Sequence, residues 1–409
     1  MVELVTTSST NGNKPALLFW DGDEAVVSSK VEYGGQVYQP IELHATLQEA
    51  IRLPVGAISY GTAQELFTEV ASVFGRYAGF SKPEADAIAM WSVTTWFPDC
   101  LASPPALLIT GPAMNQAVAL FRLLSCVCRH PLMLADISRS AIRSLPMHLR
   151  PTLLINQPDL SSGVRALWCT SNYAGMLVPG KGGSVLNIGC PKVLYSGLEE
   201  VTDPWSDTAL HMALPPRYGN PSLLEVLEQS QIADHLQPRL LMYRLQNFRK
   251  VRESRPARSR LTFPTSEVAR SLAACIQGEP DFAKIASSLL ERQEQDLIAR
   301  RSCDANIGMV EVIWVPSHEA REISVSKVTE LTNVLLRCRG ETLLYGATEI
   351  GWRSKNLGIY RHRNGKGMVL RFSQETRLRI HQLVRQFGLS LPAIDGCRNC
   401  APPQGAGTQ

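Results

Sequence analysis

The fold of this chain is decided by one stretch, Ala106-Leu107-Leu108-Ile109-Thr110-Gly111-Pro112-Ala113-Met114-Asn115-Gln116-Ala117-Val118. Its first five residues form an apolar run of strand length, and a segment with helical periodicity follows at 119–129. A strand, a Gly-Pro loop and a helix are the layout of a phosphate-binding P-loop, whose pattern is G-x-x-x-x-G-K-[ST]. Gly111 matches the first glycine. Gln116, Ala117 and Val118 replace the second glycine, the lysine and the hydroxyl residue.

A second apolar segment, residues 151–159, predicts a buried strand that ends in Asn156 and Gln157. A P-loop NTPase places Asp and Glu there, one to hold Mg²⁺ and one to activate water. Amides keep the shape of that pair, but they are poor Mg²⁺ ligands and cannot act as a general base. We therefore expect no ATP hydrolysis and no cofactor. Weak nucleotide binding by helix N-terminal amides stays open, and restoring the P-loop side chains should strengthen it if the backbone of the loop is intact.

Composition indicates a soluble globular protein with two or three domains, because 44% of the 409 residues are hydrophobic and 19% are charged. No apolar stretch is long enough to span a bilayer and no signal peptide is apparent, so a cytoplasmic location without membrane contact is expected. The ten cysteines have no repeated spacing, which argues against a disulfide framework.

Metal binding is not expected from the sequence. The only CxxC motif is Cys397-Arg398-Asn399-Cys400, and a zinc site needs a second ligand pair that is not found nearby. His318 precedes Glu319 but has no further ligand at helical spacing, so it is interpreted as a surface or helix-end residue.

Basic charge is concentrated in two blocks. Residues 239–260 contain eight Lys/Arg and one acid, and residues 337–385 contain eleven Lys/Arg and three acids. Their net charges of +7 and +8 sum to +15, so a total of +4 leaves −11 for the rest of the chain. Local blocks of this kind predict contact with a polyanion. The first block is the weaker candidate, since a basic amphipathic helix is often only a solvated face.

Around the central stretch, alternating strand and helix patterns predict an α/β domain with a mostly parallel sheet. Residues 1–14 are polar and are expected to be disordered, whereas 31–38 predict a hairpin across Gly34-Gly35. A hairpin over 176–188 carries Lys181 near its tip, either as a nucleic-acid contact or in an ordinary turn. Helices are predicted at 62–80, 81–97, 138–145, 164–171, 223–234, 238–251, 265–276 and 280–303.

The order of these motifs resembles the AAA+-like ATPase domain of primase–helicase proteins from phages and mobile elements. The residues that carry the resemblance are Trp91 and Trp96, the segments 107–112 and 150–155, and Cys190-Pro191-Lys192. The resemblance covers roughly residues 60–220 and implies oligomerisation with like or related subunits. Besides the changes above, Ser206-Asp207-Thr208 offers no arginine where the family has a phosphate-sensing one.

The C-terminal pattern of helix, turn, helix and basic hairpin resembles a winged helix-turn-helix, which places its second helix in the major groove of DNA. Arg353 and Lys355 lie near the end of the expected recognition helix, beside Trp352 and Ser354. Four basic residues lie in or near the wing: Arg361, Arg363, Lys366 and Arg371. Double-stranded DNA is therefore the expected partner, with protein contact as the alternative.

The sequence predicts five regions: a β module (1–60), a degenerate P-loop ATPase-like domain (61–220), a helical region (221–304), a winged helix (305–392) and a flexible tail (393–409). The expected function is that of an inactive ATPase-like scaffold or DNA-recognition subunit in a phage-related or mobile-element assembly. Two alternatives stay open. One is an active ATPase or helicase that uses Asp136 or Asp159, and the other is a winged-helix transcription regulator.

Overall fold

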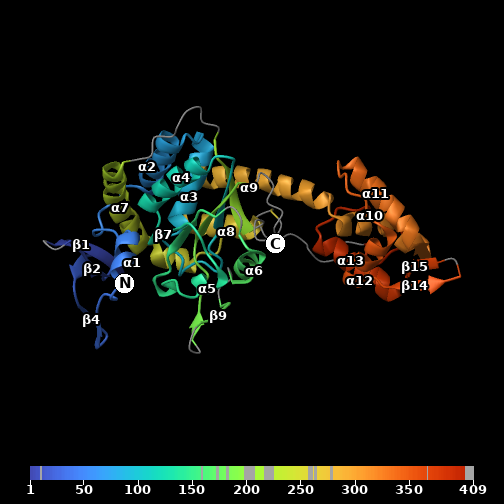
Figure 1. Cartoon of the computed structure of the whole chain (residues 1–409), viewed down its shortest axis with the longest axis horizontal. Coiled ribbons are helices and arrows are strands. Elements are labelled where there is room, and N and C mark those ends of the chain that lie inside the picture. The colour runs from blue at the N-terminus through green and yellow to red at the C-terminus, as the bar shows by residue number, and fades with distance from the viewer. Residues whose placement is uncertain are drawn as a thin grey trace. The chain divides into compact units, whose positions relative to one another are not determined.

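The protein forms two compact units, residues 1–293 (unit 1) and 294–409 (unit 2), which are described separately (Figure 1). Within the described ranges, no helix is both long and apolar enough to cross a membrane. The computed structural model describes residues 1–9, 12–157, 160–171, 175–180, 184–197, 208–215, 225–256, 261, 265–276, 280–365 and 367–400.

Unit 1 begins with an antiparallel sheet of β1 (Val2–Ser9), β2 (Gly12–Trp20) and β3 (Ala25–Ser28). The prediction of disorder for residues 1–14 is wrong for the described residues 1–9 and 12–14, because β1 pairs with β2 along its whole length. Two features fix β1 against the rest of unit 1. Val5 and Leu18 are fully buried, and Glu3 forms ion pairs with arginines of the core.

A short hairpin follows, formed by β4 (Val31–Tyr33) and β5 (Gln36–Tyr38), and it confirms the prediction from Gly34-Gly35. Both glycines have positive φ, 60° and 76°, as a two-residue turn of this type requires. Helix α1 (Ala45–Ala50) comes next.

Two helices and their tryptophans follow as predicted. Helix α2 (Ala63–Val73) continues into a π-helical turn, η1 (Phe74–Ala78), and α3 (Lys82–Thr94) begins after Ser81. The indoles of Trp91 and Trp96 are buried and donate to the carbonyls of Pro105 and Val127, each at 2.8 Å. Both tryptophans are therefore packing residues of the core.

The centre of unit 1 is a five-stranded parallel sheet with the order β12-β6-β11-β8-β7. A mixed α/β core with a parallel sheet was predicted, and it is consistent with a P-loop ATPase-like fold. The edge strand β12 was missed, although Ala209–Ala213 is a short apolar run. The strands are β6 (Ala106–Thr110), β7 (Pro131–Leu134), β8 (Thr152–Ile155), β11 (Lys192–Ser196) and β12 (Ala209–Ala213).

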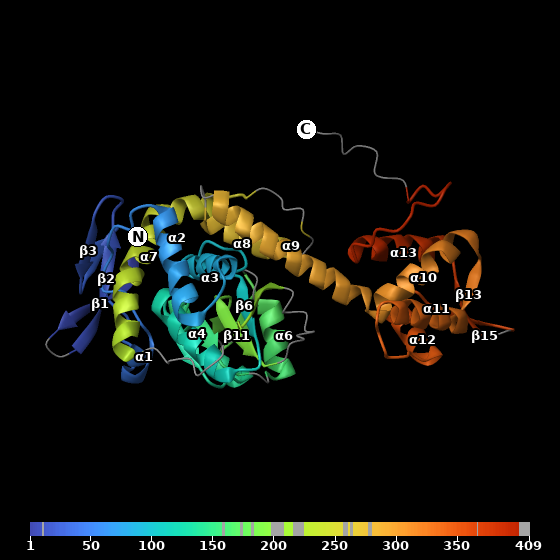
Figure 2. The ribbon, with the colours of Figure 1, turned by 90° about the horizontal axis from the view of Figure 1, so that it is seen from above.

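Helices cover both faces of this sheet (Figure 2). Because successive strand residues point to opposite faces, Leu107 and Ile109 join one hydrophobic cluster and Leu108 joins another. The first cluster includes buried side chains of α3 and α4 (Met114–Val127), and the second includes those of α5 (Arg139–Ile142) and α6 (Ser162–Ser171). Shorter elements are η2 (Met147–Leu149), β9 (Val178–Pro179) and β10 (Val185–Leu186).

A single helix, α7 (Val226–Glu253), replaces the two helices predicted at 223–234 and 238–251. Pro238 lies inside it, where a proline costs about 3 kcal/mol. Burial of neighbours such as Leu240 and Leu241 offsets that cost. The prediction failed because tertiary packing outweighed local propensity. Helices α8 (Thr265–Cys275) and α9 (Pro280–Ser302) form as predicted.

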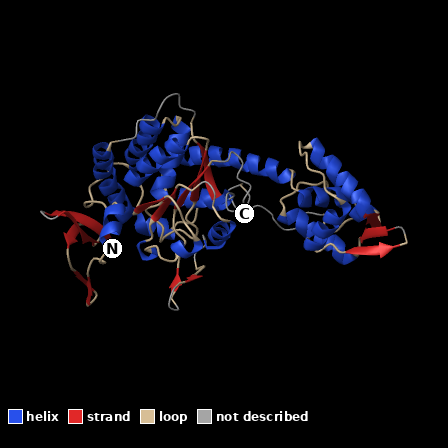
Figure 3. Cartoon of the chain, viewed as in Figure 1, coloured by secondary structure: helices blue, strands red, loops and turns tan. Residues whose placement is uncertain are grey.

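Unit 2 contains the predicted helices and hairpin. The hairpin β14–β15 projects from a helical body (Figure 3) and pairs with β13 in the order β13-β15-β14. Ile394 and Cys400 pack against the hydrophobic core, so the expectation of a flexible tail from residue 393 is wrong for its described part. The elements are α10 (Ala305–Glu319), β13 (Glu322–Ser324), α11 (Val325–Cys338), α12 (Ala347–Asn356), β14 (Arg361–Asn364), β15 (Gly367–Arg371) and α13 (Gln374–Gln386).

Candidate functional site

The turn between β6 and α4 is closely packed with protein atoms. Gly111 has a φ of 148°, which favours glycine, and a Cβ there would lie 3.0 Å from the Cβ of Leu214. The hydroxyl of Tyr195 donates to the Gly111 carbonyl at 2.7 Å. The amide of Leu214 donates to Thr110 at 2.8 Å. Gly111 is therefore explained by close packing between neighbouring strands.

The backbone that follows Gly111 does not form an open phosphate loop. Helix α4 begins at Met114, so Gln116 and Ala117 already lie within it. Both of their amides donate to the carbonyl of Ala113, at 3.1 and 3.3 Å, and that of Gln116 also donates to Asn115 Oδ1 at 3.0 Å. A P-loop presents such amides to phosphate. The assumption of an intact loop backbone is wrong, because the helix starts too early.

The burial of the α4 side chains also argues against a phosphate-binding loop. Ala117, at the position of the P-loop lysine, is fully buried in the hydrophobic core, while Val118 and Gln116 are half-buried. A lysine at position 117 would therefore enter the core instead of reaching a phosphate.

The end of β8 holds the two predicted amides in different ways. Gln157 Oε1 accepts a hydrogen bond from the amide of Ile137 at 2.8 Å, which ties together the loops after β7 and β8. Asn156 Oδ1 is buried and has no hydrogen-bond partner among the described residues. Gln157 thus has a structural role, and the Oδ1 atom of the neighbouring Asn156 has no hydrogen-bond donor among the described residues.

The alternative carboxylate Asp136 is badly placed for catalysis. It is exposed in the loop after β7, and β7 lies three strands away from β6. At about 4.8 Å per strand spacing, this amounts to about 14 Å. Asp136 cannot share a Mg²⁺ ion with phosphates bound near Gly111. Asp159, Lys181, Ser206, Asp207 and Lys366 lie outside the described residues.

In unit 2, helix α12 presents an aromatic and basic face. Trp352 is 58% exposed, and the ammonium of Lys355 lies 5.8 Å from the centroid of its indole. Arg353 is held within the protein, since it pairs with Glu349 at 3.0 Å and lies 4.9 Å from the ring of Tyr345. Of the two predicted recognition residues, Lys355 is the more available.

The hairpin places its arginines on two faces. Arg361 and Arg363 are exposed and share a face of β14, because they alternate with His362. A Cβ added at Gly351 of α12 would lie 2.7 Å from Arg361 Nη1, so this guanidinium lies directly against α12. Arg371 belongs to the opposite face, where Glu322 lies 3.5 Å away. Arg371 therefore does not share a face of the hairpin with Arg361 and Arg363.

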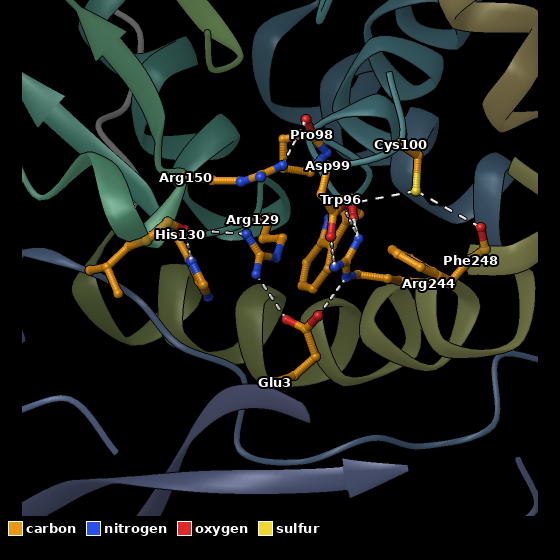
Figure 4. Close-up of polar contacts among 11 residues, drawn as sticks. Glu3, Trp96, Pro98, Asp99, Cys100, Arg129, His130, Arg150, Arg244 and Phe248 are labelled. Carbon is orange, nitrogen blue, oxygen red and sulfur yellow. Dashed lines mark hydrogen bonds and ion pairs between the residues drawn. The ribbon is translucent and has the colours of Figure 1, made fainter. Parts of the chain in front are cut away.

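Two arginines of the basic block of α7 are engaged within unit 1, Arg244 (Figure 4) and Arg239, whereas Arg249, Lys250 and Arg252 are exposed. Arg244 is 2% exposed and pairs with Glu3 at 2.7 Å and with Asp99 at 2.7 Å. Arg239 pairs with Glu69. The ring of Tyr243 is buried, so neither it nor Arg244 is available to nucleic acid.

This network sets the ionisation of its members. Burial alone would raise the pKa of Glu3, but the guanidinium groups of Arg129 and Arg244 hold that pKa far below its usual range. The same two acids, Glu3 and Asp99, raise the pKa of Arg244 despite its burial. Four charges are thus stabilised in the interior by one another.

Unit 2 contains a cluster of four potential metal ligands that the sequence does not predict. His318, His381, Cys397 and Cys400 present ligand atoms that all lie within 4.8 Å of one another. The prediction that the CxxC motif lacks a second ligand pair is wrong. The two histidines come from α10 and α13, 63 residues apart, and no local spacing rule connects them to each other or to the cysteines.

No family model matches the sequence, and no curated protein does. Among solved structures, the chain is similar to the C-terminal region of NrS-1, with 10% identity over 84% of this chain and 82% of that one and a TM-score of 0.37. It is also similar to a full-length MCM homologue from Methanopyrus kandleri, with 13% identity, coverage of 71% and 76%, and a TM-score of 0.37. Both similarities are remote.

Proposed function

We propose that this protein binds double-stranded DNA through unit 2, and that unit 1 is a P-loop ATPase-like scaffold that does not hydrolyse ATP. In this proposal residues 305–392 act as a winged helix-turn-helix. Helix α12 is the recognition helix and the β14–β15 hairpin is the wing, which is the arrangement that such domains use on DNA. The proposal places the protein in a phage-related or mobile-element assembly, with further copies or related subunits as partners.

The observation that carries the DNA proposal is the continuity of one basic face. Trp352 and Lys355 are exposed on α12, and Arg361 lies against the same helix at Gly351. Arg363 extends this face along the hairpin. A helix flanked by arginines can enter a groove while the arginines neutralise adjacent phosphates. We call these four residues the α12–wing face: Trp352, Lys355, Arg361 and Arg363.

The absence of hydrolysis is supported by three features of unit 1. The helix after β6 starts at Met114, Ala117 faces the core, and Asn156 and Gln157 replace the acids. Each removes a part that phosphoryl transfer requires: the phosphate cradle, the lysine, and the metal ligand with its water-orienting partner.

The test measures binding of the full chain to fluorescent duplex and single-stranded DNA by anisotropy. We expect duplex binding at low salt, and we expect Lys355→Ala to change the preference among duplex sequences, because a side chain of α12 would reach base edges. Arg353→Ala is the matched control, since its guanidinium is already paired with Glu349. No duplex binding at low salt would contradict the proposal. ATP turnover above background that is lost in Asp136→Ala would overturn the scaffold role.

A further inference from the structure

We propose that His318, His381, Cys397 and Cys400 form a structural Zn²⁺ site that fastens the C-terminal segment to the helices of unit 2. The proposal does not depend on DNA binding. Two cysteines and two histidines are a common ligand set of structural zinc. Four protein ligands close a tetrahedral shell and leave no open position for substrate, which distinguishes this site from a catalytic one.

The distances fit a tetrahedral ion. Each sulfur lies 3.5 Å from one imidazole nitrogen: Cys397 Sγ from His381 Nε2, and Cys400 Sγ from His318 Nε2. The two Nε2 atoms are 3.1 Å apart. A tetrahedral Zn²⁺ with ordinary bond lengths separates sulfur from nitrogen ligands by about 3.6 Å and two nitrogens by about 3.3 Å. These three distances thus match those that the ion requires, and all four ligand atoms lie within 4.8 Å of one another.

Hydrogen bonds alone explain this arrangement poorly. Nδ1 of His318 lies 2.8 Å from the carbonyl of Trp314, an acceptor, so this nitrogen carries the proton. The neutral ring then has one lone pair, on Nε2, and both His381 Nε2 and Cys400 Sγ approach it. A single cation at the centre satisfies all four atoms at once. The bond to a backbone carbonyl is also the outer contact that orients metal-bound histidines.

The surrounding structure is built to hold these ligands. The indole of Trp314 packs edge-on against both imidazoles, with ring centroids 4.7 Å from each, and donates to the carbonyl of Pro392 at 2.9 Å. Two successive turns, Cys397 to Ile394 and Cys400 to Cys397, bring both sulfurs to one side of the segment. His381 is buried, and the other three ligands are half-buried.

The site joins three parts of the chain. His318 lies in the last turn of α10, His381 lies within α13, and the cysteines lie in the segment after α13. Zn²⁺ binding releases a proton from each thiol that arrives protonated, and the two thiolates and two neutral imidazoles form four bonds to the ion. Metal binding should therefore fix α13 and the tail against α10.

The test uses the full chain, purified without a histidine tag and exposed to Zn²⁺ or to Co²⁺. We expect about one Zn²⁺ per chain after dialysis, and for Co²⁺ the thiolate charge-transfer bands and intense visible bands of a tetrahedral S₂N₂ site. The double variant Cys397→Ser/Cys400→Ser should lose both signals. Cys338→Ser, which changes an exposed cysteine of the same unit outside the cluster, should retain them.

If the double variant does not fold, His318→Gln keeps the test decisive. It should release zinc to a competing chelator at least about tenfold more readily, since even loss of an outer partner weakens metal sites by 10- to 100-fold. Wild-type protein that takes up neither Zn²⁺ nor Co²⁺ would overturn the proposal. So would a Cys397–Cys400 disulfide without metal, or a double variant that binds metal as well as the wild type.

Discussion

Two basic blocks of similar net charge differ in how their side chains are paired in the structure. Residues 239–260 and 337–385 carry net charges of +7 and +8. In the first block, Arg239 and Arg244 meet the acids Glu69, Glu3 and Asp99. In the second, Lys355, Arg361 and Arg363 stay exposed, and the two arginines share one face of β14.

The difference lies in where the acids come from. Glu3 is 241 residues away from Arg244 in the chain, so no local count of charge could pair them. Buried charges require such partners because desolvation is expensive. A basic side chain that pairs with no acid in the folded protein can bind a polyanion. The comparison predicts that substitution of the buried, paired Arg244 changes stability and that substitution of the exposed Arg361 and Arg363 changes binding.

The largest effect is expected from Arg244→Ala. It leaves the buried carboxylate of Glu3 with only part of its compensation, and breaking such pairs costs about 3–5 kcal/mol. Urea denaturation of the full chain would measure the loss. Arg249→Ala is the control, since its pair with Glu253 is exposed and contributes at most about 0.5 kcal/mol. Equal, small losses in both variants would mean that the network does not hold unit 1 together.

Restoring the P-loop side chains tests whether unit 1 tolerates a charge without a partner. Gln116→Gly/Ala117→Lys/Val118→Thr should lower the free energy of unfolding by about 3 kcal/mol or more, because position 117 faces the core. ATP binding should not appear, since the amides of α4 are engaged. Calorimetry with ATP and a urea titration give both readouts. A stable variant that binds ATP would show that the turn can open into a phosphate loop.

The pH dependence of stability follows from Glu3. Its pKa is lowered in the folded protein, so it stabilises the fold above the unfolded-state pKa of about 4.3, and that contribution is lost as the pH falls toward the folded-state pKa. For a paired carboxylate this amounts to about 2–3 kcal/mol. Urea midpoints measured between neutral and acidic pH should fall more steeply for wild type than for Glu3→Gln. Parallel curves would contradict the assignment.

Gly351→Ala should separate stability from binding in unit 2. Alanine favours a helix over glycine by about 1 kcal/mol, while its methyl group must displace the guanidinium of Arg361. The midpoint of thermal unfolding should rise and DNA affinity should fall. If the affinity is unchanged, Arg361 takes no part in the α12–wing face.

Elements with strong local signals were predictable from the sequence. The Gly34-Gly35 hairpin, the Ser81 helix start and the order of elements in unit 2 each depend on neighbouring residues. The failures involve contacts between distant residues. Strand β1 needs Arg244 of α7 and Arg129 of the segment after α4, and the continuity of α7 through Pro238 needs packing against the core. The cluster at Cys397 and Cys400 needs two helices to bring histidines together.

The most direct test of the central claim compares two double variants of equal charge. Arg361→Ala/Arg363→Ala removes two arginines of the α12–wing face, and Arg249→Ala/Lys250→Ala removes two exposed charges of the first block. Duplex affinity of the full chain is measured by anisotropy over a salt series. Each phosphate contact contributes about 0.9 to the slope of log affinity against log salt, so the first variant should lower the slope by about 1.8 and the second should leave it unchanged. The opposite result, or equal losses in both, would contradict the assignment of DNA binding to unit 2.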